Sequence, residues 1–109
     1  MSSAPLLGEF EHLVALGVLQ SGEDAYGVPV WRAISDRTAR TVSLAAVYKT
    51  LDRLETKGLV RSRLGEPTPE RGGRARRVYA VTPSGLAAVR ASVQAIAQMT
   101  AGLDEVLGT

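Results

Sequence analysis

The spacing of the apolar residues changes from a period of 3.6 to a period of 2 at Gly58 and changes back at Thr82, and this pattern limits the possible folds. Within residues 43–57 the apolar side chains repeat at helical spacing, whereas residues 59–64 and 77–81 alternate as β-strands do. Helical spacing resumes after Thr82. The chain therefore predicts a mainly α fold with a small β-hairpin, of the α+β class.

Two further helices are expected before residues 43–57. Apolar side chains are so dense within residues 6–19 that a helix there would be buried on more than one side, which suggests a partner beyond the domain's own core. A second helix should cover about residues 28–38. In the third helix, Ser43 can act as the N-cap, and Gly58 occupies the position that follows a helix C-terminus.

The two strands should form a hairpin with a long tip, because residues 65–76, which are rich in proline, glycine and arginine, separate them. A last helix should begin directly after the second strand. Thr82 would be its N-cap and Pro83 would occupy its first helical position. This helix is expected to run to about Leu107, a length of roughly 37 Å if it is unbroken.

The order helix, helix, helix, strand, long loop, strand, helix is that of a winged helix-turn-helix. Of the 109 residues, 1–82 would form this DNA-binding domain and 83–109 a C-terminal dimerisation helix, the two packed as one compact unit. Residues 37–81 hold eleven basic and four acidic side chains, a balance of +7, whereas the whole chain has a net charge of only +2. The middle of the chain is therefore the candidate surface for a polyanion, with an ordinary solvated surface as the alternative.

The third helix has the residue types that a helix in the major groove requires. Small side chains near its N-terminus would let the backbone approach the DNA, and hydrogen-bond donors follow one and two turns later. These candidates fall on the side away from the apolar stripe, so the core and contact faces do not compete. The candidate contacts are Ser43, Ala45, Ala46, Lys49 and Arg53. For Lys49 and Arg53, the alternative is a solvated helix face.

The loop at residues 65–76 would act as the wing. Its adjacent glycines allow a tight reversal, and Arg74 and Arg76 are expected to project from the hairpin tip toward phosphates or a narrow minor groove. Arginine suits this role because its guanidinium pairs with phosphate through two donors. The alternatives are a flexible surface loop or an RNA-binding segment of the RGG type.

A dimer is expected because one short helix and one wing bury too little surface to specify a DNA site. The last helix has apolar residues at alternating spacings of three and four, a heptad-like pattern that usually faces another helix. This seam consists of Leu86, Val89, Val93, Ile96, Thr100, Leu103 and Leu107. Packing of this helix on its own domain alone is the alternative.

The sequence resembles the PadR-like transcriptional regulators, in particular the short members with a single C-terminal helix. The resemblance covers nearly the whole chain and is carried by LGEFEHLVALGVL, AYGVPVWRAIS, SLAAVYKTLDRLETKGLV and GEPTPERGGRARRVYAVTPSG. It implies a bacterial or archaeal dimeric repressor whose third helix, residues 43–57, reads the major groove. Its first and last helices would form the dimer interface.

Several site residues follow from this resemblance. The implied DNA contacts are Ser43, Ala46, Tyr48 and Lys49 on the third helix and Arg71, Gly73, Arg74 and Arg76 on the wing. For Tyr48, the alternative is a ring that belongs mostly to the core. The implied dimer contacts are Leu6, Phe10, Leu86, Val89, Val93, Ile96 and Leu103. Some family members bind a planar molecule between aromatic side chains at the dimer interface, and here Phe10 and Trp31 are the candidates for such an effector pocket, with core packing as the alternative.

Enzymatic and metal-binding functions find no support in the sequence. There are no cysteines, so a disulfide framework and a thiolate metal site are both excluded. His12 is the single histidine and has no second histidine with which to share a metal, and no cofactor is expected. There is no phosphate-binding glycine loop that opens a helix. No run approaches the roughly 20 apolar residues of a membrane span, and we expect a cytoplasmic protein.

The sequence therefore predicts a homodimeric, sequence-specific transcriptional repressor that binds double-stranded DNA at a two-fold symmetric site. A small-molecule effector of unknown identity would act by changing the separation of the two recognition helices. The alternative is a dimeric protein-interaction module that has the winged-helix fold without specific DNA binding.

Overall fold

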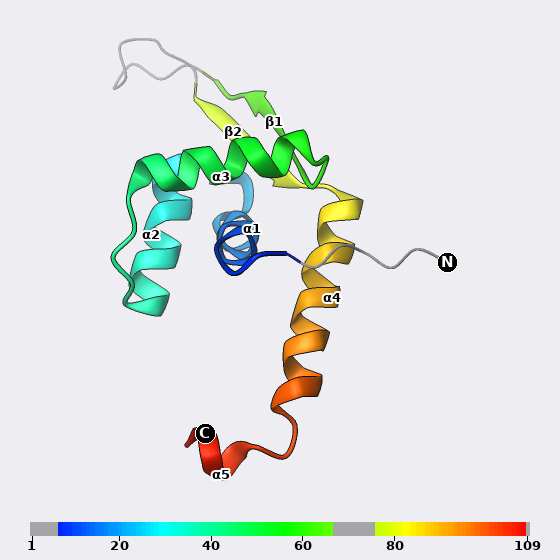
Figure 1. Ribbon diagram of the computed structural model, residues 1–109. Coiled ribbons are helices and arrows are strands. Elements are labelled where there is room, and N and C mark those ends of the chain that lie inside the picture. The colour runs from blue at the N-terminus through cyan, green and yellow to red at the C-terminus, as the bar shows by residue number, and fades with distance from the viewer. Residues whose placement is uncertain (1–6, 67–75, 109) are drawn as a thin grey trace.

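The computed structural model describes residues 7–66 and 76–108, and within them it has the predicted α+β architecture (Figure 1). Helices precede and follow one antiparallel hairpin, as the two changes of apolar period indicated. The elements are α1 (Glu9–Ser21), a 3-10 turn η1 (Gly22–Asp24), α2 (Gly27–Thr38), α3 (Leu44–Thr56), β1 (Val60–Leu64), β2 (Arg77–Val81), α4 (Pro83–Thr100) and α5 (Asp104–Leu107).

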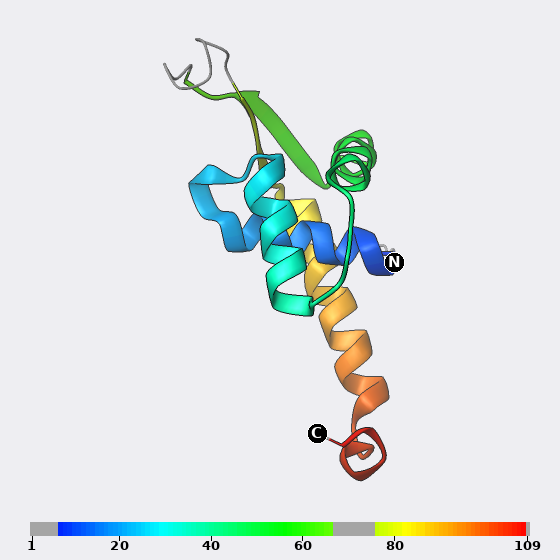
Figure 2. The same cartoon turned by 90° about the vertical axis from the view of Figure 1, so that its left-hand side faces the viewer.

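Helix α1 lies at the centre of the domain, with α2 and α3 packed around it and the first turns of α4 against its other side (Figures 1 and 2). The core is built from apolar side chains that these helices and the hairpin turn toward one another. Val14 of α1, Val30 of α2 and Leu51 of α3 are completely buried, and Tyr79 of β2 is nearly so. The dense apolar stretch of α1 is therefore largely used inside its own chain.

Both predicted ends of α3 are confirmed. The Ser43 hydroxyl accepts a hydrogen bond of 3.0 Å from the Ala46 N–H, which satisfies one of the free donors of the first turn. At the other end, Gly58 adopts a positive φ of 76°, a conformation that favours glycine. The Leu59 N–H then donates to the Leu54 carbonyl at 2.9 Å, so the chain reverses directly into β1.

The hairpin pairs β1 with β2 in a register that runs from Val60 opposite Val81 to Leu64 opposite Arg77. At the far end of the ladder, the Gly65 N–H donates to the Arg76 carbonyl at 2.6 Å. On the other side of β2, the Tyr79 N–H donates to the carbonyl of Ala25 at 2.8 Å. The hairpin is thereby attached to the segment that joins η1 to α2.

The start of α4 also agrees with the prediction. The Thr82 hydroxyl accepts from the Gly85 N–H at 3.0 Å, and Pro83 is the first helical residue. Gly85 is required for a different reason, because a Cβ atom there would overlap the carbonyl oxygen of Leu59. The absence of a side chain lets α4 begin directly against the turn between α3 and β1.

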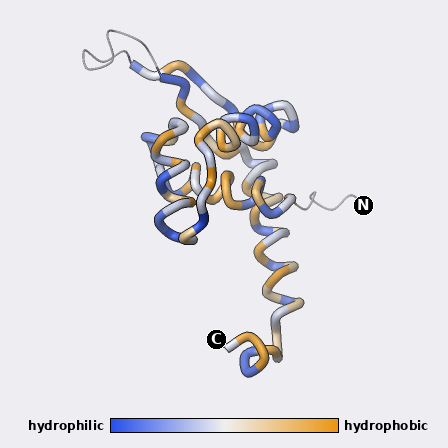
Figure 3. Tube along the Cα trace, turned by 60° about the vertical axis from the view of Figure 1, so that its left-hand side comes forward, coloured by the Kyte–Doolittle hydropathy of each residue, from blue (hydrophilic) through white to orange (hydrophobic). Residues whose placement is uncertain are grey.

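The prediction of one helix from Pro83 to about Leu107 is wrong. Helix α4 ends at Thr100, where the chain turns through Gly102 at a positive φ of 84° before the short α5 (Figure 1). Glycine adopts this conformation at little cost, so the helix stops here although the apolar spacing continues. The second half of α4 extends away from the domain and carries several apolar residues (Figure 3). No helix in the described parts of the chain is long and apolar enough to cross a membrane.

Candidate nucleic-acid interface

Helix α3 presents two chemically different sides. Val47, Leu51 and Leu54 are completely buried, whereas an exposed stripe runs along the opposite side. This stripe consists of Ala45, Tyr48, Lys49, Asp52, Arg53 and Thr56. Among the predicted contacts, Ser43 is also exposed, at the start of the helix, and Ala46 is half-buried. The exposed stripe therefore gathers most of the predicted contact residues of α3 on one accessible surface.

Tyr48 belongs to this stripe and also anchors it. Its side chain is 40% exposed, and a Cβ atom at Gly27 would overlap the Tyr48 ring. The ring therefore lies directly against the first residue of α2. Tyr48 is neither a core residue nor a free surface residue, because one edge of the ring packs on α2 while the rest stays accessible.

Of the residues predicted to contact DNA from the wing, the structure describes Arg76 alone. Arg71, Gly73 and Arg74 lie outside the described residues. Arg76 lies at the base of the wing and not at its tip, because its guanidinium stacks on the Tyr26 ring with 4.1 Å between the guanidinium carbon and the ring centroid. This cation–π contact and the pairing of Gly65 with Arg76 correct the expectation for Arg76.

Three basic residues of the hairpin were not singled out from the sequence. Arg61 and Arg63 are exposed on one face of β1, and Arg77 is exposed at the start of β2 on the other face. They contributed to the count of positive charge in residues 37–81. The alternation of the strands places Arg61 and Arg63 on the face opposite Arg77, a separation that could have been found from the sequence.

Arg77 is held close to α3 through Ser62. The Arg77 Nη1 donates to the Ser62 hydroxyl at 3.0 Å, and this hydroxyl donates to the Glu55 carboxylate at 2.6 Å. The Ser62 N–H donates to the same carboxylate oxygen at 3.0 Å. Burial raises the pKa of the neighbouring Tyr79 phenol, and the negative charges of Asp52 and Glu55 raise it further. The hairpin and α3 therefore share a polar cluster at their junction.

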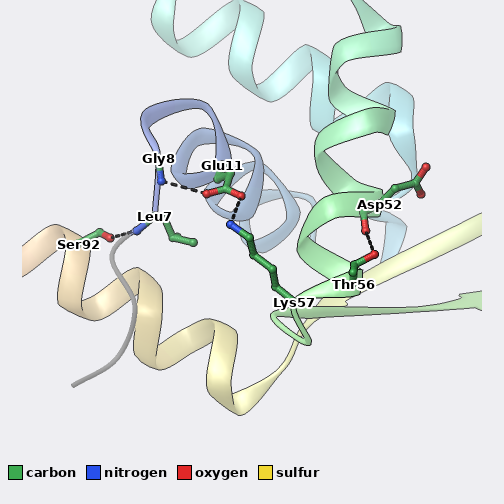
Figure 4. A network of polar contacts seen from close by, with 7 residues as sticks. All are labelled: Leu7, Gly8, Glu11, Asp52, Thr56, Lys57 and Ser92. Atoms are coloured by element: carbon green, nitrogen blue, oxygen red, sulfur yellow. Dashed lines mark hydrogen bonds and ion pairs between the residues drawn. The ribbon is translucent and has the colours of Figure 1, made fainter. Parts of the chain in front are cut away.

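A second polar network ties α3 to α1 (Figure 4). The Lys57 ammonium lies 2.7 Å from the carboxylate of Glu11, which is buried and also accepts from the Gly8 N–H at 3.0 Å. The hydrogen bond from Lys57 lowers the pKa of Glu11 despite the opposing effect of burial. On the other side of α1, the Leu7 N–H donates to the hydroxyl of Ser92 in α4 at 3.1 Å.

The predicted dimer seam is only partly available. Leu86 is half-buried and Val89 is 5% exposed, so both pack within their own chain. Farther along α4, Val93 is 48% exposed and Ile96 62% exposed, and Leu103 is exposed beyond the end of the helix. Met99, which falls outside the heptad pattern, is 77% exposed and belongs to the same apolar region. Leu6 lies outside the described residues, and Phe10 is half-buried.

The two candidates for an effector pocket both pack on the core. The indole N–H of Trp31 donates to the Val42 carbonyl at 2.8 Å, which fixes the loop between α2 and α3. A cavity of about 340 Å³ lies between α1 and α4, and neither Phe10 nor Trp31 lines it. Its lining consists of Leu7, Glu9, His12, Leu13, Ser92, Ala95 and Ile96. Packing is thus the observed role of both aromatic residues.

His12 is half-buried in α1 and is one of the residues that line the cavity between α1 and α4. Its Nε2 atom is buried, and no hydrogen-bond partner for it is found among the described residues. Within residues 7–66 and 76–108, no three His, Cys, Asp or Glu side chains gather in a way that could hold a metal ion.

Comparisons with known proteins agree with this geometry. The sequence model of the transcriptional regulator PadR-like family matches residues 15–91. A search of curated proteins found no match.

Among solved structures, a PadR family transcription regulator from Clostridium difficile is 20% identical, with a TM-score of 0.73 over 92% of this chain and 99% of that one. A PadR family regulator from Eggerthella lenta is 26% identical, with a TM-score of 0.68 over 93% of this chain and 88% of that one. The ORC1 protein of Aeropyrum pernix in complex with DNA is 21% identical, with a TM-score of 0.65 over 85% of this chain and 26% of that one.

Proposed function

This chain belongs to the PadR-like family of transcriptional regulators, and we propose that it represses transcription as a homodimer bound to a two-fold symmetric DNA site. In this proposal α3 enters the major groove and the wing, residues 65–76, contacts the backbone or the minor groove. The two copies of α3 would bind half-sites about one helical turn apart.

The DNA-binding part of this proposal rests mainly on the exposed stripe of α3, which lies beside a basic hairpin. Ala45 leaves room for close approach to the bases, and Lys49 and Arg53 supply donors one and two turns later. Arg77 adds positive charge at the junction of α3 with the hairpin. The exposed charges of Lys49 and Arg53 take no part in the core, so both side chains are available to contact a partner. Part of the ORC1 protein, whose structure was solved in complex with DNA, has the same fold, which is consistent with DNA binding by this chain.

The exposed apolar side chains of α4 and the segment after it support the homodimer. Val93, Ile96 and Met99 stand on a helix that leaves the domain, and Leu103 follows it. Burying such side chains against a second copy would remove apolar surface from water, which favours association. A dimer also presents two recognition helices, which a two-fold symmetric site requires. The alternative remains a dimeric protein-interaction module without specific DNA binding.

The test is fluorescence anisotropy of the pure protein with DNA from directly upstream of its own gene, beside a shuffled duplex, over a salt series. With about six to eight phosphate contacts per dimer, log affinity should fall with log salt at a slope of roughly −5 to −7. A preference for the native duplex that persists above about 150 mM salt supports a specific regulator. Weak binding to both duplexes with a flat salt dependence favours the interaction module.

Regulation by a small molecule stays a prediction. Because Phe10 and Trp31 pack on the core, an effector between them would have to displace core contacts. A cytoplasmic location, the absence of enzymatic activity and the absence of a cofactor likewise remain part of the proposal, consistent with a family of transcriptional regulators.

A further inference from the structure

We propose that Glu55 and Ser62 are positioning residues that hold Arg77 against a DNA phosphate. This phosphate would lie between the groove that α3 enters and the part of the DNA backbone that the wing contacts. This inference rests on the proposed function and assigns a DNA contact outside the predicted set. The three residues come from α3, β1 and β2, so they meet only in the folded protein.

The register of the hairpin places Ser62 and Arg77 on the same face. Ser62 is opposite Tyr79 and Leu64 is opposite Arg77, so Ser62 and Arg77 are diagonal neighbours across the ladder. Ser62 contacts Glu55 of α3 directly, which shows that this face of the hairpin is turned toward α3. The Arg77 guanidinium is consequently held at the junction between the two elements that would contact DNA.

The hydrogen bonds have a fixed direction along this chain of residues. A carboxylate only accepts, so the Ser62 hydroxyl must give its single proton to Glu55, at 2.6 Å. The oxygen of Ser62 then has a lone pair for Arg77, whose Nη1 donates at 3.0 Å. Glu55 therefore sets the orientation of the serine, and the serine sets the position of the arginine.

Arg77 stays able to bind a phosphate while it is held. The hydrogen bond to Ser62 uses its Nη1 alone, and the side chain is exposed. A guanidinium has five donors, and its planar fork matches two phosphate oxygens. Because Ser62 already restricts the side chain in the free protein, less rotamer entropy remains to be lost when DNA binds.

Asp52 and Glu55 give this arrangement a further property. Both carboxylates lie close enough to raise the pKa of Tyr79, and Arg77 acts on the same phenol in the opposite direction. These negative charges reduce the general attraction of the junction for phosphates. Binding here should therefore depend on a phosphate that comes close enough to accept hydrogen bonds from Arg77.

The test compares DNA binding by the wild type, Arg77→Ala, Ser62→Ala and the double variant, measured by anisotropy over a salt series. We expect Arg77→Ala to weaken binding about tenfold and to make the salt slope shallower by about one for each protomer. Ser62→Ala should weaken binding roughly threefold, and it should have no further effect once Arg77 is alanine, because the serine acts only through the arginine.

Two further variants separate positioning from folding and from general charge. Ser62→Thr keeps the hydroxyl and should restore wild-type binding, whereas a purely steric role for the serine would make it at least as harmful as Ser62→Ala. Arg61→Ala removes an exposed positive charge from the opposite face of the same hairpin and should change affinity by less than about twofold.

Additive effects of Ser62→Ala and Arg77→Ala, or equal losses from Arg61→Ala and Arg77→Ala, would overturn this inference while leaving the proposed function intact. If instead the wild type binds both duplexes weakly and with a flat salt dependence, the proposed function fails and the inference fails with it. Thermal melting of each variant, expected within a few degrees of the wild type, shows whether the loss of binding reflects unfolding.

Discussion

Helices α3 and α4 both bury one side against α1, yet they expose opposite chemistry. Helix α3 shows Lys49 and Arg53 to solvent, whereas α4 shows Ile96 and Met99. On the buried side, both helices have the apolar stripe that is expected of an amphipathic helix. In our proposal, the difference reflects what the exposed side binds: a charged partner for α3 and an apolar partner for α4.

The periodicity of apolar residues identifies one face of a helix, but it does not show what covers that face. In α4 the apolar residues follow one heptad-like seam, but Val89 is buried in its own chain while Ile96, seven residues later, is 62% exposed. The change occurs where α4 leaves the domain. A continuous sequence pattern thus serves the core in its first half and, in our proposal, a second copy in its second half.

The largest expected effect concerns the buried side of α3. Leu51→Ala should lower the free energy of unfolding by about 3 kcal/mol, because Leu51 is completely buried and its truncation leaves a cavity. Urea denaturation at constant protein concentration measures this. Lys49→Ala, on the exposed side of the same helix, should stay within about 0.5 kcal/mol of the wild type. Similar losses from both variants would contradict the division of α3 into two faces.

The next effect concerns the exposed side of α4. Ile96→Glu should raise the dimer dissociation constant by about 100-fold, or roughly 2.7 kcal/mol, because the proposed interface would have to bury a carboxylate. Sedimentation equilibrium measures the change. Gln98→Glu adds the same charge to an exposed position of the same helix and should leave the association constant nearly unchanged. A monomeric wild type, or an Ile96→Glu dimer as stable as the wild type, would rule out this interface.

A smaller effect is expected from the charged stripe of α3. Lys49→Ala combined with Arg53→Ala should weaken DNA binding by about 2 kcal/mol without lowering stability, and the salt slope should become shallower because fewer phosphates are neutralised. Arg32→Ala removes an exposed charge from α2 and serves as the control, with an expected change below about 0.5 kcal/mol. If the α2 variant loses as much affinity as the double variant, binding depends on overall charge and not on α3.

The smallest expected effect concerns the ion pair between Glu11 of α1 and Lys57, the residue directly after α3. The pKa of Glu11 is lowered in the folded protein from its ordinary value of 4.5, so the carboxylate stabilises the fold above that pH and loses this contribution as the pH falls through its lower folded value. Glu11→Gln should therefore cost about 1 kcal/mol at pH 7, since Lys57 is half-exposed.

Denaturation of the wild type and of Glu11→Gln at pH 7 and near pH 3 tests this sign, because the difference between the two proteins should shrink in acid. A difference that stays constant or grows at low pH would contradict the assignment of Glu11 as an ionised partner of Lys57.

The sequence predicted those parts of the fold that depend on local chemistry. Ser43 and Thr82 cap their helices because a hydroxyl at that position accepts from a nearby free N–H, whatever the rest of the fold. The hairpin followed from strand alternation in the same way. The break after Thr100 was missed because Gly102 is tolerated inside helices as well as at their ends.

The candidate site was predicted less completely, because its geometry depends on contacts between distant residues. Nothing in the sequence near Arg76 indicates that its guanidinium stacks on Tyr26, fifty residues earlier, and the expectation of a residue at the wing tip failed for that reason. The cluster of Glu55, Ser62 and Arg77 joins three elements and could not be read from any one of them. The exposed stripe of α3 was identified because it lies within a single helix.

The hydrogen bonds at the N-terminus of α1 have a geometric consequence for the proposed dimer. Through Leu7 this helix is attached to Ser92 in α4, and through Glu11 to Lys57 directly after α3. Helix α1 is thus bonded both to α4, which has the proposed subunit contact, and to the end of α3, which would contact DNA (Figure 4). In the dimer without an effector, the distance between the two recognition helices would then vary little. Operators whose half-sites are one base pair closer together or farther apart would bind more weakly because of this spacing, whatever their base sequence.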